Sequence, residues 1–299
     1  METKRIKKLL QTVLKFVVTG LAIFFVIRTI DLHETKRILS EAKYGYLLLA
    51  TLFFIASKVV SSLRLNQYFS AIDLKIAESY NLRLYWIGMF YNLFLPGGIG
   101  GDGYKVYLLN KQYRTPVKQL IAATLIDRIS GLMALLFLLL VLAVFLAPFE
   151  FMYGFDWVIY VALIIGYPIY FVFNKLFFKS FVRCIWQTSI YSLFVQGLQL
   201  ICAWFILLSL EITEAQMAYQ LLFLASSVVA VLPFTIGGVG ARELTFILGH
   251  QYLGIDQNAA VAFSVLFFLI TLVVSAAGGF LTAKADTSAR EFSQQENTK

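Results

Sequence analysis

Two glycine-rich stretches contain residues of the types that bind phosphate. The stretch Leu95–Lys105 is repeated at Leu232–Arg242, with six of the eleven positions identical. Glycines at the start of a short helix can present backbone N–H groups to an anion, and the helix dipole favours negative charge there. The alternative is that these glycines only allow helices to cross closely. The candidate anion-binding glycines are Gly97, Gly98, Gly100 and Gly101 in the first copy and Gly237, Gly238 and Gly240 in the second.

Charged residues within or beside apolar runs are the second group of candidates: Asp102, Lys105, Asp127, Arg128, Arg242 and Glu243. A charge at the centre of a membrane helix costs about 2.5–3.5 kcal/mol, so each needs a partner or water. Adjacent helical residues do not face each other, so we expect Asp127 to pair with Arg242 and Glu243 with Arg128. These six residues predict either a basic cavity for an anionic headgroup, with the three acids as proton carriers, or structural ion pairs between two halves. A further cation, Lys58, is expected to snorkel to the membrane surface.

Composition identifies the elements that must position these residues. The chain has 299 residues, of which 60% are hydrophobic and 14% charged. A soluble protein would have about 25% charged residues, and apolar runs recur along the whole chain, so we predict an all-α polytopic membrane protein. Basic loops facing an anionic leaflet explain the net charge of +8 without nucleic acid. The two histidines and two cysteines form no cluster with metal-ligand spacing, so neither metal nor cofactor is predicted.

The apolar runs predict about six full transmembrane helices and two re-entrant hairpins that contain the glycine motifs. Residues 64–83 predict an amphipathic helix at the membrane surface. Residues 84–95 are too few to cross a hydrocarbon core of about 30 Å. A model with eight full crossings stays open, because residues 216–232 are long enough to span. The expected spans are residues 14–30, 44–63, 118–146, 157–173, 190–210 and 259–283, and the expected hairpins are residues 84–113 and 216–250.

The distribution of basic residues predicts the orientation. With both termini in the cytoplasm, cytoplasmic segments contain 18 of the 25 Lys and Arg, as expected in the cytoplasmic membrane. Residues 1–284 are then one membrane domain built from an inverted repeat, with halves at about 14–147 and 157–284. Residues 285–299 have the composition of a disordered tail. Paired helix breaks in two such halves are typical of a transporter's central site.

Three linked motifs resemble one known family. Leu95–Gly103, Asp127–Arg128 followed by Gly131, and Gly237–Glu243 are similar to the transmembrane region of lysylphosphatidylglycerol synthases, a flippase-like family of bacterial and archaeal membrane proteins. The resemblance covers about residues 10–284. In the bifunctional synthases this region moves aminoacylated phosphatidylglycerol between leaflets, and a soluble C-terminal domain carries out the aminoacyl transfer. Because the resemblance is to the transmembrane region and not to the soluble domain, it implies a translocating region without transferase activity.

The sequence hypothesis is a translocase for a membrane phospholipid or a polyprenyl-phosphate-linked lipid. No ATP-binding motif or recognisable catalytic motif occurs, so we expect passive or proton-coupled movement rather than an enzyme. Two other classes stay open: a membrane-embedded transferase or hydrolase acting on a lipid phosphate, and a non-catalytic partner of a cell-envelope glycosyltransferase. Whether the chain forms a homo-oligomer is also left open.

Overall fold

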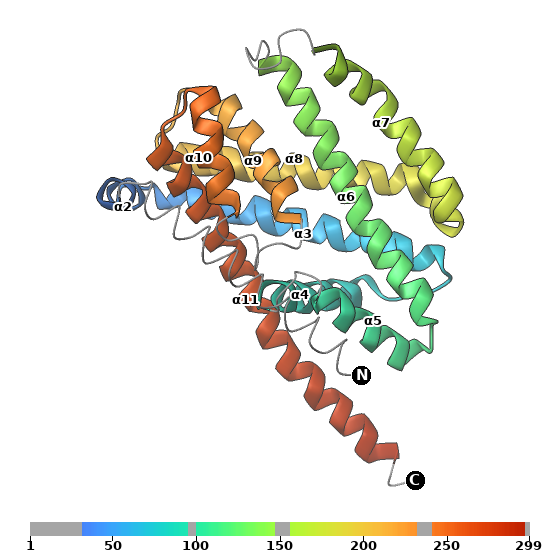
Figure 1. The fold of residues 1–299 in the computed structure, drawn as a ribbon. Helices are drawn as coiled ribbons and strands as arrows, with labels where there is room; N and C mark the ends of the chain where they lie inside the picture. Colours follow the sequence, from blue (N-terminus) through green and yellow to red (C-terminus); the bar gives the residue numbers. More distant parts are fainter. Residues whose placement is uncertain (1–31, 95–99, 147–155, 232–240, 297–299) are drawn as a thin grey trace, which may run out of the picture.

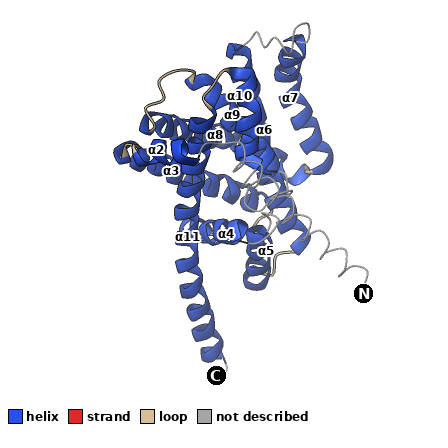
Figure 2. Cartoon of the chain, turned by 60° about the vertical axis from the view of Figure 1, so that its left-hand side comes forward, coloured by secondary structure: helices blue, strands red, loops and turns tan. Residues whose placement is uncertain are grey.

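The computed structural model describes residues 32–94, 100–146, 156–231 and 241–296, with side chains of the last helix described as far as Leu281. These residues form helices without any strand (Figures 1 and 2). The elements are α2 (Leu32–Ser40), α3 (Tyr44–Ala71), α4 (Glu78–Phe94), α5 (Gly100–Tyr113), α6 (Val117–Leu146), α7 (Asp156–Phe177), the 3-10 helix η2 (Lys179–Cys184), α8 (Ile185–Ser209), α9 (Gln216–Val231), α10 (Ala241–Leu253) and α11 (Gln257–Glu296).

Five helical segments in the described residues are long and apolar enough to cross a membrane: α3, α6, α7 from Trp157, η2 with α8, and α11 as far as Leu281. They agree with five of the expected spans, and the sixth, residues 14–30, lies outside the described residues. The protein is thus an all-α polytopic membrane protein. The helix α11 continues to Glu296, through residues for which the sequence predicts a disordered tail (Figure 1). The division into one domain and a tail stays a prediction.

The expected surface helix at residues 64–83 is wrong. The helix α3 continues to Ala71, and α4 begins at Glu78, earlier than the expected residue 84. The apolar side chains of this stretch face protein rather than lipid, since Tyr68 and Phe69 are buried and Tyr68 packs edge-on against Phe181 with ring centroids 5.8 Å apart. The chain turns between the two helices at Asp73, whose φ is 63°.

Two long helices, α3 and α8, lie antiparallel through the middle of the bundle (Figure 1). At one end the Lys43 N–H donates to the Ser209 carbonyl at 2.8 Å, and at the other end Arg183 donates to the Ser70 carbonyl at 2.8 Å. Beyond the first end, the Lys43 ammonium lies 2.6 Å from the Glu211 carboxylate. The hydrogen bond between these two exposed groups raises the pKa of Lys43 and lowers the pKa of Glu211.

Four shorter helices form two hairpins, α4 with α5 and α9 with α10. They contain 17, 14, 16 and 13 residues. At 1.5 Å per residue these helices are about 20–26 Å long, which is less than a hydrocarbon core of about 30 Å. Each hairpin packs against the last long helix of the other half of the chain: α4 lies on α11 and α9 lies on α6 (Figure 1). The first contact includes a hydrogen bond from Arg83 to the Leu281 carbonyl at 3.2 Å.

Candidate functional site

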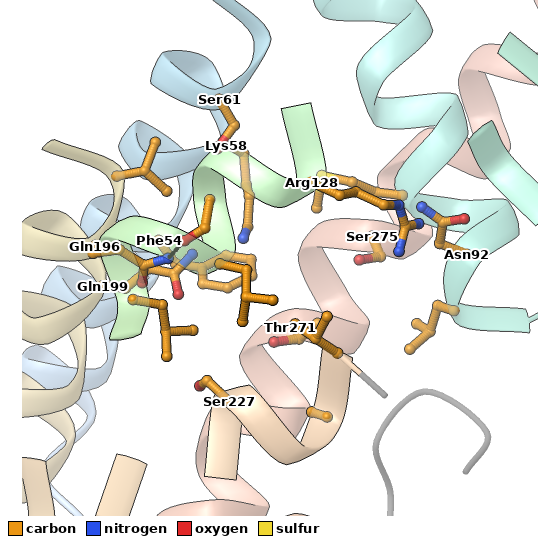
Figure 3. Close-up of a pocket in the computed structure, with 18 of the residues that line it drawn as sticks. Phe54, Lys58, Ser61, Asn92, Arg128, Gln196, Gln199, Ser227, Thr271 and Ser275 are labelled. Carbon is orange, nitrogen blue, oxygen red and sulfur yellow. Dashed lines mark hydrogen bonds between the residues drawn. The ribbon is translucent and has the colours of Figure 1, made fainter. Parts of the chain in front are cut away.

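A cavity of about 370 Å³ lies between the two halves of the chain (Figure 3). The long helices α3, α6, α8 and α11 contribute residues to its wall, as do α4, α9 and α10. Its apolar lining residues are Phe54, Tyr85, Met89, Leu93, Leu132, Leu135, Val195, Ala230, Val231 and Phe267. Its polar lining residues are Lys58, Ser61, Arg64, Asn92, Arg128, Gln196, Gln199, Ser227, Arg242, Thr271 and Ser275, and Gly131 also contributes.

Helical spacing explains why the polar residues face one cavity. On α3, Lys58, Ser61 and Arg64 follow one another at intervals of three residues, which places them along one face of the helix. On α11, Thr271 and Ser275 are four residues apart and share a face in the same way. Each of these otherwise apolar helices therefore turns a polar stripe towards the cavity.

Four cations and no acid are found among the described lining residues. Two of the cations, Lys58 and Arg242, form no ion pair within the described part of the chain. The Lys58 ammonium lies 4.4 Å from the centre of the Phe54 ring, and the Arg242 guanidinium lies 4.8 Å from that of Phe267. Arg242 also donates to the Ser227 hydroxyl at 3.2 Å. The sequence prediction that Lys58 snorkels to the surface is wrong, because Lys58 lines the cavity.

The third cation, Arg64, is part of a buried network. Its Nε lies 2.8 Å from a carboxylate oxygen of Asp127, and its Nη1 donates to Ser192 at 2.9 Å. The network joins α3, α6 and α8. The expected pair of Asp127 with Arg242 is wrong, because Asp127 on α6 pairs with Arg64 on α3.

The fourth cation, Arg128, belongs to a second cluster. The Asp102 carboxylate bonds to the Arg128 guanidinium and to the Lys105 ammonium, the latter at 2.8 Å. Asp102 and Lys105 are nearly buried, whereas the Arg128 side chain is 35% exposed. Neither Asp102 nor Lys105 lines the cavity, so these two predicted residues lie behind Arg128 and hold it from α5.

The last predicted acid, Glu243, is buried and accepts a hydrogen bond from Ser264 on α11 at 2.9 Å. The expected pair of Glu243 with Arg128 is not among the ion pairs of the described residues, in which Arg128 pairs with Asp102. Although Arg242 and Glu243 are adjacent in the sequence, their side chains lie in different environments, because Arg242 lines the cavity and Glu243 does not.

Among the described glycines of the first motif, Gly101 contributes to helix packing and to a hydrogen bond at the start of α5. A Cβ atom on Gly101 would lie 1.9 Å from the carbonyl oxygen of Gly88, so α5 crosses α4 at a distance that only glycine allows. The Gly101 N–H donates to the side-chain oxygen of Asn92 at 2.8 Å. Gly100 begins α5 and is partly exposed. The candidates Gly97, Gly98, Gly237, Gly238 and Gly240 lie outside the described residues.

The helix ends that flank both glycine motifs nevertheless meet in the cavity. Leu93 precedes the first motif, Val231 precedes the second and Arg242 ends it, and all three line the same space. The paired breaks thus indicate the location of the cavity. Sequence reasoning missed Arg64, Asn92, Gln196 and Gln199. The signal for Arg64 was its three-residue spacing from Ser61 within the same helix, whereas isolated Asn and Gln residues carry no such signal.

No group of three or more His, Cys, Asp or Glu in the described residues could hold a metal ion. The arrangement suits a different task, which is to hold an anion beside apolar walls.

A comparison with curated proteins finds no match. The family model of the lysylphosphatidylglycerol synthase TM region matches residues 12–279, which is most of the chain. Both hairpins and all the lining residues of the cavity fall within this range. The chain is therefore a multi-pass membrane protein that belongs to the family of the lysylphosphatidylglycerol synthase transmembrane region.

Proposed function

We propose that the protein moves a lipid with an anionic headgroup from one leaflet of the membrane to the other through the cavity. The observation that carries this proposal is a cavity inside a bundle of membrane helices whose described lining residues include four cations and no acid. Placing cations in a membrane is costly unless a counter-charge or water meets them. A lipid phosphate supplies that counter-charge.

The mixed lining supports a lipid rather than a small ion. The polar stripes of α3 and α11 face side chains such as Met89, Leu132 and Leu135 across the same space. A volume of about 370 Å³ accommodates a headgroup but not two acyl chains. The headgroup would follow the polar stripes while the acyl chains stay in the bilayer.

The packing of the hairpins supports alternating access. The reciprocal contacts of α4 with α11 and α9 with α6, about the antiparallel pair α3 and α8, fit an inverted repeat. The short hairpin helices fit re-entrant segments that approach from opposite faces. Movement of one half against the other would open the cavity to each leaflet in turn. We place the protein in the cytoplasmic membrane with both termini on the cytoplasmic side. Whether lipid movement is coupled to protons can be tested by applying a proton gradient across the vesicle membrane.

The test is translocation by pure protein in liposomes that contain a fluorescent anionic lipid. The fraction of lipid that an external reductant can reach should rise well above that of protein-free vesicles. Arg242→Gln should reduce the rate at least tenfold, because Arg242 lines the cavity, donates to the Ser227 hydroxyl and has no ion-pair partner among the described residues. Lys111→Gln, which removes a charge from the exposed end of α5, is the matched control.

Equal translocation rates for Arg242→Gln and the unaltered protein would show that the cavity is not the translocation path. An absence of translocation for every lipid, with protein shown to be folded, would overturn the proposed function.

A further inference from the structure

The charges in and behind the cavity do not cancel. Lys58, the two ion-pair clusters and the adjacent residues Arg242 and Glu243 together comprise five cations and three acids, which leaves an excess of two positive charges. The acids each stay close to a defined partner: Asp127 beside Arg64, Asp102 between Lys105 and Arg128, and Glu243 beside Ser264. The cations are Lys58, Arg64, Lys105, Arg128 and Arg242, and the acids are Asp102, Asp127 and Glu243.

We propose that the cavity selects a lipid whose headgroup ends in a phosphate monoester, with close to two negative charges, over lipids with a phosphate diester. This inference rests on the proposed function and specifies its substrate class. A phosphate monoester carries about −1.5 to −2 charges at pH 7 and three terminal oxygens. A diester carries one charge and two free oxygens, so it would leave one cation of the excess without a counter-charge.

The cations reach the cavity from different sides. Lys58, Arg128 and Arg242 reach the cavity from three different elements, α3, α6 and α10. Neutral donors stand between them, and Arg128 points towards Asn92 and Ser275 in Figure 3, whereas Lys58 lies on the other side above Phe54. Cations on several sides can each contact a separate oxygen of one phosphate.

An amine-bearing headgroup fits the same lining poorly. Ethanolamine and aminoacyl headgroups carry an ammonium group, which needs a carboxylate or several acceptors when it is removed from water. The described lining residues offer no carboxylate, and two of their four cations have no acidic partner in the described chain. We therefore expect the preference to be phosphatidic acid first, phosphatidylglycerol second and phosphatidylethanolamine last.

The experiment compares these three lipids with identical acyl chains in two assays. The first measures binding, as the rise in unfolding temperature of the detergent-purified protein on addition of each short-chain lipid. The second measures translocation in phosphatidylcholine liposomes that contain one labelled lipid at a time. Phosphatidic acid should bind at least tenfold more tightly than phosphatidylglycerol and should move faster.

Variants connect this preference to the cavity. Lys58→Gln and Arg242→Gln should each bring the ratio of phosphatidic acid to phosphatidylglycerol affinity close to one, whereas Lys111→Gln should leave the ratio unchanged. Glycerol 3-phosphate separates a lipid from a soluble phosphate monoester. If it stabilises the protein as strongly as phosphatidic acid, the lipid substrate is overturned although the phosphate chemistry stands.

The two assays separate the two proposals. Equal binding of phosphatidic acid and phosphatidylglycerol would overturn the monoester preference, even if both lipids are moved. Tight and selective binding of phosphatidic acid without translocation of any lipid would support the preference and overturn the proposed function.

Discussion

At the scale of single residues, the geometry of Arg64 shows how this protein tolerates a buried charge. Its Nε and Nη1 bond to different partners, Asp127 on α6 and Ser192 on α8, at 2.8 and 2.9 Å. Ser192 also donates to the Thr188 carbonyl at 2.8 Å. One planar guanidinium therefore joins three helices, which the point charge of a lysine could not do with the same geometry.

Replacement of Arg64 by methionine should lower the free energy of unfolding by about 3–5 kcal/mol, because Asp127 would remain buried without its cation. Arg64→Met combined with Asp127→Leu should recover much of this loss, since no unpaired charge remains. Denaturation in detergent, followed by tryptophan fluorescence, measures both variants. A double variant as unstable as the single one would show that the pair is not the source of the loss.

The sequence predicts which charged residues are buried, but it does not predict their ion-pair partners equally well. Asp102, Lys105 and Asp127 are nearly buried, as their apolar surroundings suggest. Their partners depend on which helices are adjacent, and that information is not local. Arg64 illustrates the difficulty, because an arginine followed by mixed residues also fits a helix on the membrane surface.

At the scale of elements, the crossing of α4 and α5 depends on two facing glycines. The position of a Cβ on Gly101 would be 1.9 Å from the Gly88 carbonyl oxygen, and a Cβ on Gly88 would be 2.5 Å from the Lys105 side chain. By contrast, a Cβ on Gly103 would meet no atom within 4 Å. The same short helix thus contains one glycine that packing requires and one that it does not.

Gly101→Ala should destabilise the protein by about 1–3 kcal/mol, because α5 must move away from α4. The matched variant Gly103→Ala should be neutral or stabilising by up to about 1 kcal/mol, since alanine favours helix. Thermal unfolding in detergent compares the two. Similar unfolding temperatures for both variants would contradict the close crossing of these helices.

The elements themselves were mostly predictable, because five apolar runs coincide with five long helices. Residues 64–83 were not, since a helix with one apolar face fits a membrane surface and a protein core equally well. The side chains of Tyr68 and Phe69 distinguish the two only after η2 and α8 are placed beside them. The bend at Asp73 contains no glycine or proline that would have marked it.

At the scale of the whole molecule, the cavity is a property of the assembly of the two halves. The glycine repeat indicates where the halves meet, and Arg128 and Arg242 were candidates from the sequence. Residues such as Gln196 and Thr271 are single polar side chains in apolar helices, and only the packing of α8 and α11 brings them to one space. The sequence therefore predicts the position of the site and part of its charge, but not its lining.

The orientation of the molecule gives a last prediction. The structure places the Lys43 and Glu211 side chains at one end of the pair α3 and α8, and Arg183 with Ser70 at the other. If the end that contains Arg183 is cytoplasmic, a cysteine at Lys111 or Lys179 should react with an impermeant maleimide only in inverted vesicles. A cysteine at Glu214 should react only in intact cells or right-side-out vesicles.

All three positions are exposed, and the native Cys184 and Cys202 are buried and can be replaced by serine as a background. The assay reads the side of each loop independently of transport, so it tests the arrangement even if the cargo proposal fails. Three membrane-crossing helices, α6, α7 and α8, separate Lys111 from Glu214, so these positions should lie on opposite sides of the membrane. Labelling of both positions from the same side would mean that the chain between them crosses the membrane an even number of times. That result would overturn the inverted relation between the hairpins α4–α5 and α9–α10, and with it the argument for access to the cavity from both leaflets.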